Sequence, residues 1–206
     1  MKEDLLKRIT LTGYNVSYGA NLNFATYEIV KKYPGIIAFL SIVFGILGLK
    51  VQMFANECVS IILLILGVAS VYIEHFTENV ESYSELGMAN TNLLNRLKEL
   101  YYEAKSMDDD ADFSGIKISY REIEKEFNSS SQPNQILFSN WFAHYKLFWE
   151  KDVSWMDEQL HFKFWKDKIP QSMKAFILAF AIVIIAYYCY KVPIINEFFC
   201  TILYID

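Results

Sequence analysis

The side chains that could do acid–base or nucleophilic chemistry are few and scattered in this sequence. The three histidines are His75, His144 and His161. General acid–base catalysis needs partners within hydrogen-bond distance, and the acids near the last two histidines include Glu150, Asp157 and Glu158. The sequence has no glycine-rich phosphate loop, no H-E-x-x-H and no G-x-S-x-G pattern. We therefore expect surface or core histidines, no enzyme activity and no cofactor.

Potential metal ligands do not follow a known binding pattern either. Aspartates cluster between residues 108 and 112, but an EF-hand loop needs glycine where Phe113 stands and glutamate where Ser119 stands. This stretch is predicted to be a solvated linker. The cysteines, Cys58, Cys189 and Cys200, lie in or beside apolar segments without C-x-x-C spacing. We interpret them as small hydrophobic residues, not as a metal site or a disulfide framework.

Small and polar residues inside the apolar stretches are the remaining candidates for function. Ser60, Gly67 and Glu74 recur every seven residues, and Ser70 falls on nearly the same helix face. In an oligomer this stripe could line a water-filled path, with Glu74 as a ring of charge at its cytoplasmic mouth. The alternative, which we prefer, is helix packing through small residues beside an ordinary boundary acid.

A second set of small residues lies on one face of the preceding apolar stretch. Its members are Ser41, Gly45 and Gly48. Such a face lets another helix approach closely, so these are candidate helix-packing residues. The next apolar stretch is the expected neighbour.

These residues belong to three stretches that are nearly free of charge, at residues 33–49, 58–73 and 175–190. Lipid offers no water to backbone polar groups, so a segment that enters it must be helical throughout. The uninterrupted runs are shorter than the roughly 20 residues of a perpendicular span, but flanking lysines can extend to the headgroups. The sequence predicts an all-α membrane protein with a transmembrane hairpin and a third, C-terminal transmembrane helix. The alternative is a soluble bundle with very apolar core helices.

Charge predicts the topology and excludes one class of partner. The net charge of −5 argues against nucleic acid, because phosphate binding needs clustered positive charge. Lys and Arg are abundant before the first stretch and between the second and third, whereas residues 50–57 carry Lys50 alone. The positive-inside rule then predicts a multi-pass protein of the cell membrane, with a cytoplasmic N-terminus. The expected regions are a cytoplasmic or interfacial helix (1–33), the hairpin (34–76), a cytoplasmic helical region (77–170) and a C-terminal membrane segment (171–206).

Apolar periodicity predicts the helices on either side of the hairpin. Residues 5–32 are expected to be helical but interrupted near Gly13 and Gly19, with Pro34 at the start of the first span. The helix of the second span is expected to continue into a heptad-like apolar stripe over residues 80–104. This stripe would be either an oligomerising stalk or one wall of a cytoplasmic bundle.

The rest of the middle region is rich in aromatic residues. Residues 116–127 are predicted to form a short amphipathic helix, and residues 135–168 hold every tryptophan. Trp141, Tyr145 and Trp149 follow helical spacing and are candidate partner-binding residues. Their helix is expected to pack its aromatic face on the neighbouring helices, with a position at the membrane interface as the alternative. Residues 194–205 are expected to be an interfacial or re-entrant tail.

The chain resembles the SLATT family in three runs: LNFATYEIVKKYPGIIAFLSI, NLLNRLKELYYEAK and QILFSNWFAHYKLFWEKDVSWMDEQLHFKFWKDKIPQSM. The similarity extends over about residues 22–173. SLATT proteins are bacterial membrane domains associated with SMODS nucleotidyltransferases and SLOG sensor domains, and they are usually described as two-spanning. The apolar stretch from residue 175 onward departs from that description.

The resemblance implies an effector of a bacterial antiviral or conflict system. Such an effector would oligomerise and form a pore or perturb the lipid bilayer when it receives a cytoplasmic signal. Its partner system would contain a nucleotidyltransferase, a reverse transcriptase or a sensor domain. The alternative is a non-conducting membrane scaffold or sensor that recruits a soluble partner through its cytoplasmic helices.

Overall fold

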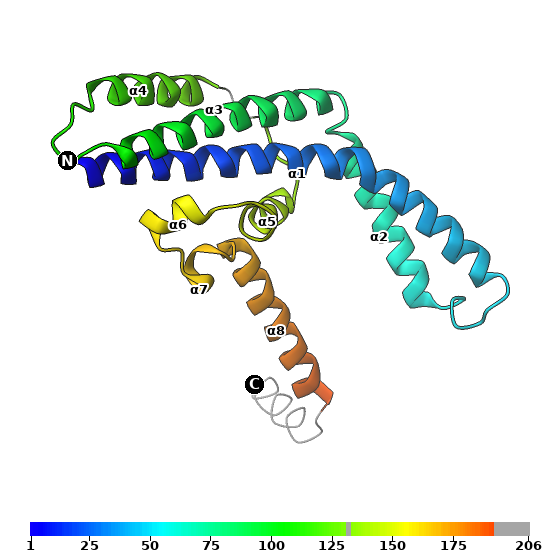
Figure 1. Cartoon of the computed structure of the whole chain (residues 1–206). Helices are drawn as coiled ribbons and strands as arrows, with labels where there is room; N and C mark the ends of the chain where they lie inside the picture. The colour runs from blue at the N-terminus through cyan, green and yellow to red at the C-terminus, as the bar shows by residue number, and fades with distance from the viewer. Residues whose placement is uncertain (131–132, 192–206) are drawn as a thin grey trace, which may run out of the picture. The chain divides into compact units, whose positions relative to one another are not determined.

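A computed structural model describes residues 1–130 and 133–191, and every regular element in this part of the chain is helical (Figure 1). The longest element, α1 (Lys2–Gly48), is one continuous helix. The expected interruption near Gly13 and Gly19 is therefore wrong. Both glycines are buried, and a Cβ atom on Gly13 would lie 2.5 Å from Cη2 of Trp155. Glycine at position 13 leaves room for the Trp155 ring and does not end the helix.

Pro34 lies inside α1, so the expectation that it starts a helix is also wrong. A proline within a helix lacks one backbone donor and bends the helix. The helix is bent between its N-terminal part, which packs against α3, and its C-terminal part, which packs against α2 (Figure 1). Residues 1–33 and 34–76 share this helix, and their division into separate regions stays a prediction.

Two helices follow each other along α1, namely α2 (Glu57–Glu74) and α3 (Val80–Ser106). The expected continuous helix across this point is wrong, because residues 75–79 form turns. Thr77 donates from its backbone N–H and its hydroxyl to the Glu74 carbonyl, at 3.0 and 2.7 Å. Thr and Asn are weak helix formers, and the break lets α3 follow the N-terminal part of α1.

The apolar stripe on α3 forms a wall of the bundle, which is one of its two predicted roles. Its residues buried within the bundle are Tyr83, Gly87, Asn90, Leu93, Leu97, Tyr101 and Ala104. The helix α4 (Ser114–Ser129) confirms the predicted amphipathic helix and packs on α3. Before it, the Asp112 carboxylate accepts hydrogen bonds from the Ser114 N–H at 2.9 Å and hydroxyl at 2.7 Å. These two bonds lower the pKa of Asp112 and begin α4.

The opposite side of α1 is covered by α5 (Ser139–Tyr145), the π-helical turn η1 (Lys146–Glu150) and α6 (Ser154–Leu160) (Figure 1). The small residues Ser139 and Ala143 are buried, and so is Leu147. They follow one another at a spacing of one helical turn, so they mark the inner face. Trp155 of α6 lies in the main core with its ring centroid 5.3 Å from that of Tyr101.

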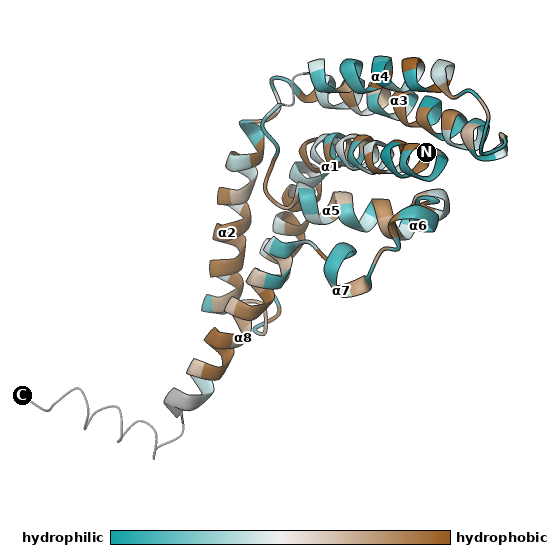
Figure 2. Ribbon diagram, turned by 90° about the vertical axis from the view of Figure 1, so that its left-hand side faces the viewer, coloured by the Kyte–Doolittle hydropathy of each residue, from teal (hydrophilic) through white to brown (hydrophobic). Residues whose placement is uncertain are grey.

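Three helices of the described chain are long and apolar enough to cross a membrane: α1, α2 and α8 (Gln171–Lys191). In the hairpin of α1 and α2, large side chains such as Phe39, Leu64 and Val71 are at least 64% exposed. Figure 2 shows α2 and α8 as hydrophobic over most of their length, whereas α4 is largely hydrophilic. Apolar residues that face outward on all sides are typical of helices in lipid, so this is an all-α membrane protein. The predicted tail at residues 194–205 lies outside the described residues.

Glu158 of α6 forms hydrogen bonds with α3, so it connects helices on the two sides of α1. Its carboxylate accepts hydrogen bonds from Lys105 Nζ at 2.6 and 2.7 Å and from the Tyr101 hydroxyl at 2.9 Å. The Lys105 ammonium, followed by the Tyr101 hydroxyl, lowers the pKa of Glu158. A lowered folded-state pKa means that this stabilisation is present at neutral pH and is lost as the pH falls through the lowered value.

The Glu158→Gln variant is therefore expected to have a melting temperature a few degrees below that of the wild type at neutral pH. The difference in melting temperature will narrow below about pH 4, where an ordinary glutamate protonates. Thermal denaturation followed by circular dichroism in detergent, at several pH values, measures this. A melting-temperature difference that stays constant with pH would contradict the assigned ion pair.

Candidate functional site at the base of the hairpin

The segment of residues 133–138, here called the junction segment, lies where the bundle meets the hairpin. Its Gln135 side chain accepts a hydrogen bond from the Thr26 hydroxyl at 2.6 Å and donates one to Asn23 Oδ1 at 3.1 Å. Asn23 and Thr26 are fully buried in α1. Buried polar groups are costly to leave unpaired, so these bonds hold the junction segment against the middle of α1.

The next residue of the junction segment fills a small apolar core. Ile136 is 3% exposed and packs in a cluster with Ile29, Val30, Ile37 and Ile73. Three of these belong to α1 and one to α2. This cluster is separate from the main core of the bundle. Burial of one isoleucine contributes about 1.5–3 kcal/mol, so Ile136 is a substantial link between the two helices of the hairpin and the junction segment.

Two tyrosines also form hydrogen bonds with the backbone of the junction segment. The backbone N–H of Leu137 donates to the Tyr72 hydroxyl of α2 at 3.3 Å. The Tyr83 hydroxyl of α3 donates to the Asn134 carbonyl at 2.6 Å. The junction segment thereby contacts α1, α2 and α3 within six residues, at the point where α2 ends and α3 begins.

Charged residues surround the same point. Lys146 of η1 pairs with Glu28 of α1, and both side chains are largely buried, at 14% and 25% exposed. Lys31 pairs with Glu81 across α1 and α3 at 2.7 Å, but this pair is mostly in solvent. A partly buried pair is screened less than an exposed one. The Lys146–Glu28 pair therefore contributes more to the attachment of η1 than the Lys31–Glu81 pair contributes to that of α3.

The junction segment connects α5 and α3 to both helices of the hairpin through Gln135, Ile136 and the two tyrosines. The sequence analysis missed these residues. One signal was available: Asn23 and Thr26 are polar residues at helical spacing, and Ile136 begins a short apolar run after a polar loop.

The predicted stripe on α2 faces away from α1. Ser60, Gly67 and Glu74 are exposed, whereas Ser70 is partly buried. Nothing lies within 4 Å of the position of a Cβ on Gly67, so α1 does not occupy this face. The Ser60 hydroxyl donates to the Asn56 carbonyl at 3.2 Å. Packing of this stripe against another helix, and its alternative, the lining of a pore, stay predictions.

The small-residue face of α1 does not receive α2 in the expected way. Gly45 has nothing within 4 Å of its Cβ position, and Gly48 has the Phe54 carbonyl of the hairpin loop at 3.6 Å. Ser41 is partly buried. The expectation that α2 is the neighbour at Gly45 is therefore wrong. A role for these residues in packing another helix stays a prediction.

The candidate partner-binding residues lie on the outer face of α5 and η1. Tyr145 and Trp149 are 52% and 63% exposed, and Trp141 is partly buried. The rings of Trp141 and Phe138 meet edge to face, with centroids 4.8 Å apart. Phe138 has a left-handed backbone with a φ of 67° immediately before α5. That turn places an aromatic ring beside the first turn of the helix.

The histidines lie on different elements. His144 packs its ring 5.1 Å from that of Tyr18, His75 follows the end of α2, and His161 ends α6 with a left-handed backbone. Two of the three acids considered as their partners are engaged elsewhere: Glu158 with Lys105, and Asp157 with the backbone N–H of Phe162 at 2.7 Å. Within the described residues, no three His, Cys, Asp or Glu side chains gather as a metal site requires.

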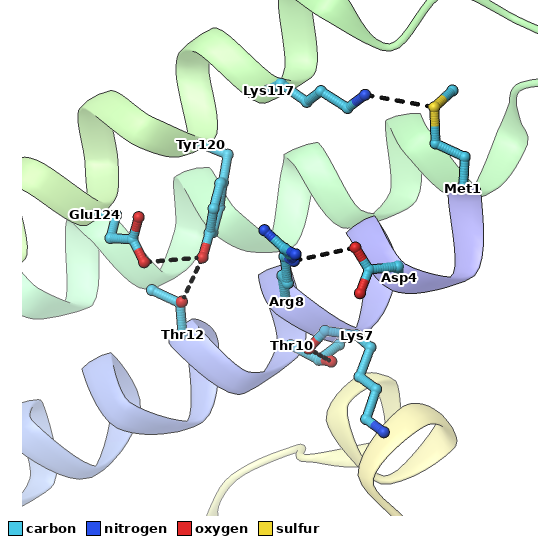
Figure 3. Close-up of polar contacts among 9 residues, drawn as sticks. All are labelled: Met1, Asp4, Lys7, Arg8, Thr10, Thr12, Lys117, Tyr120 and Glu124. Atoms are coloured by element: carbon cyan, nitrogen blue, oxygen red, sulfur yellow. Dashed lines mark hydrogen bonds and ion pairs between the residues drawn. The ribbon is translucent and has the colours of Figure 1, made fainter.

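A cleft of about 290 Å³ lies between the first turns of α1 and α4 (Figure 3). Its cationic lining residues are Arg8, Lys117 and Arg121. Arg8 is paired with Asp4 at 3.1 Å, and both side chains are well exposed. Tyr120 at its edge bonds with Thr12 at 3.0 Å and with Glu124 at 3.1 Å. The excess of positive charge favours an anion, but water screens these exposed groups.

Comparison with protein-family models shows the family to which the chain belongs. A family model described as SMODS and SLOG-associating 2TM effector domain 6 (SLATT_6) matches residues 1–177. The chain is a SLATT protein. No curated protein and no solved structure matches it.

Membership of the SLATT family makes this protein an effector domain of conflict systems, built on two transmembrane helices. The two helices of the family description correspond to the hairpin of α1 and α2. The match ends at residue 177, inside α8. Most of the third candidate span therefore lies beyond the part of this SLATT protein that the family model covers.

Proposed function

We propose that this protein is a membrane effector that oligomerises through its hairpin and permeabilises or perturbs the bilayer when its cytoplasmic bundle receives a signal. The proposal places the N-terminus and the bundle in the cytoplasm, as the distribution of Lys and Arg predicts. The signal would come from a partner system with a nucleotidyltransferase, a reverse transcriptase or a sensor domain.

The observation that carries the proposal is the continuity of α1. One helix forms the centre of the bundle with its N-terminal part and the first span with its C-terminal part. A change in the bundle thus reaches the bilayer without a flexible linker. The junction segment extends that connection to α2, because Ile136 packs with residues of both helices.

The outer stripe of α2 supports the oligomeric part of the proposal. Gly67 is exposed, and among the described residues nothing lies within 4 Å of its Cβ position, so a helix from another copy has room to approach there. In lipid, helices associate through small residues that allow close backbone contact. In such an assembly, Ser60 and Glu74 would lie near the helix–helix contact or along a central path.

A substitution that fills this space tests the proposal. Gly67→Leu is expected to prevent close approach and to remove most of the release of a trapped dye from vesicles containing the purified full chain. Gly35→Leu is the matched control, since Gly35 also has nothing within 4 Å but lies on α1 outside the stripe. Equal dye release from both variants and the wild type would argue against the stripe. No release from any of them, with the partner system and its trigger also present, would argue against permeabilisation.

A further inference from the structure

We infer that the outer face of α5 and η1 is a membrane-interface surface, so that the long axis of the bundle lies along the bilayer surface. In the alternative, here called an upright bundle, that axis would continue the axis of the hairpin away from the bilayer. This interface surface consists of Leu137, Phe138, Trp141, Tyr145 and Trp149. Its occupant is the headgroup region of the bilayer that the hairpin spans. The inference depends on that bilayer location and not on pore formation.

The first support is the side chains themselves. Leu137 and Trp149 are 63% exposed, Phe138 is 54% and Tyr145 is 52% exposed. The opposite face of the same segment, with Ala143 and Leu147, is fully buried in the bundle. An amphipathic segment with aromatic residues outward is typical of a position at the membrane interface, and Trp and Tyr favour the headgroup level.

The second support is the direction in which the hairpin leaves the bundle. In Figures 1 and 2, α3 and α4 lie on one side of α1, while α5 lies on the other side, toward which the hairpin bends. The bilayer that contains the hairpin therefore faces α5 and not α4. The hydrogen bond between the Leu137 N–H and the Tyr72 hydroxyl fixes one end of the interface surface at the end of α2.

The nature of the interface surface favours lipid over an acidic or basic partner. Its residues carry no charge, and the nearby Lys146 is directed at Glu28 within the bundle. The apolar surface is also continuous with the exposed apolar surface of α2, through Tyr72 and Leu137. A soluble protein that covers the interface surface is the competing occupant.

The test uses the full chain in phosphatidylcholine vesicles, with its three cysteines replaced by alanine. Single cysteines are introduced by Phe138→Cys, Tyr145→Cys or Trp149→Cys and labelled with an environment-sensitive fluorophore. Ile118→Cys on α4 is the matched control, because Ile118 is 58% exposed on the other side of the bundle. Quenching is measured with brominated lipid and with aqueous iodide.

We expect quenching by brominated lipid to be several-fold greater at all three positions than at Ile118, and quenching by iodide to be correspondingly weaker. An upright bundle would give lipid quenching at Phe138 alone, which would overturn the inference. Protection from iodide without lipid quenching would mean that protein covers the interface surface, and would also overturn it. Dye release measured on the same vesicles reports the proposed function separately, since the labels can be quenched by lipid whether or not the vesicles leak.

Discussion

Ile136→Asp is expected to abolish the effect of the overproduced protein on cell growth and membrane potential while leaving the bundle folded. The side chain at this position is 3% exposed and packs in a cluster of apolar residues. An unpaired carboxylate there costs several kcal/mol, which is more than the junction segment gains from the burial of Ile136. The segment will therefore leave the base of the hairpin.

The bundle is expected to survive this change because Ile136 is not part of the main core around Leu97, Tyr101 and Trp155. Circular dichroism and limited proteolysis of the purified variant measure that. Ile118→Asp is the control, since it makes the same chemical change at an exposed position of α4. Full activity of Ile136→Asp, in a protein that remains inserted in the membrane, would show that the junction segment does not couple the bundle to the hairpin.

Gly13→Leu is expected to unfold the bundle at the temperature at which the wild type is still native. A Cβ atom at this position would already lie 2.5 Å from Cη2 and 3.2 Å from Cζ2 of Trp155. Trp155 is 2% exposed and packs on Tyr101 in the main core, so a displacement of its ring disturbs other core contacts. Overpacking of a tight core costs about 1–3 kcal/mol and sometimes more, and a leucine adds three carbon atoms beyond the Cβ.

Gly115→Leu is the matched control, because nothing lies within 4 Å of its Cβ position in α4. It is expected to leave the melting temperature unchanged or raise it slightly, since glycine is a poor helix former. In the background of Gly13→Ala, the change Trp155→Phe removes the ring atoms that clash, so the losses in stability of the two changes will be less than additive. Strict additivity would show that Trp155 does not contact Gly13.

The parts of the fold that depend on local periodicity were predictable from the sequence. The three apolar stretches correspond to the end of α1, α2 and α8, and the amphipathic pattern of residues 116–127 corresponds to α4. In each case the apolar residues are adjacent along one helix or continuous along a stretch. No knowledge of distant partners is needed to recognise them.

The parts that depend on tertiary contacts were not predictable. Gly13 resembles a helix breaker in the sequence, but its function is to accommodate Trp155, which lies 142 residues away along the chain. The junction segment has no helix or strand that a periodic pattern could reveal. The role of Gln135 depends on its hydrogen bonds with Asn23 and Thr26, which are distant in the sequence. The outward direction of Gly67 likewise depends on the register in which α2 packs on α1.

The central claim is that the hairpin acts on the bilayer, and the membrane potential of living cells tests it most directly. Cells that overproduce the chain are monitored with a voltage-sensitive dye, while fractionation measures how much protein is inserted. We predict depolarisation that follows the amount of inserted protein and precedes the arrest of growth. A normal potential in cells with abundant inserted protein, both without and with the partner system and its trigger, would contradict the proposed function.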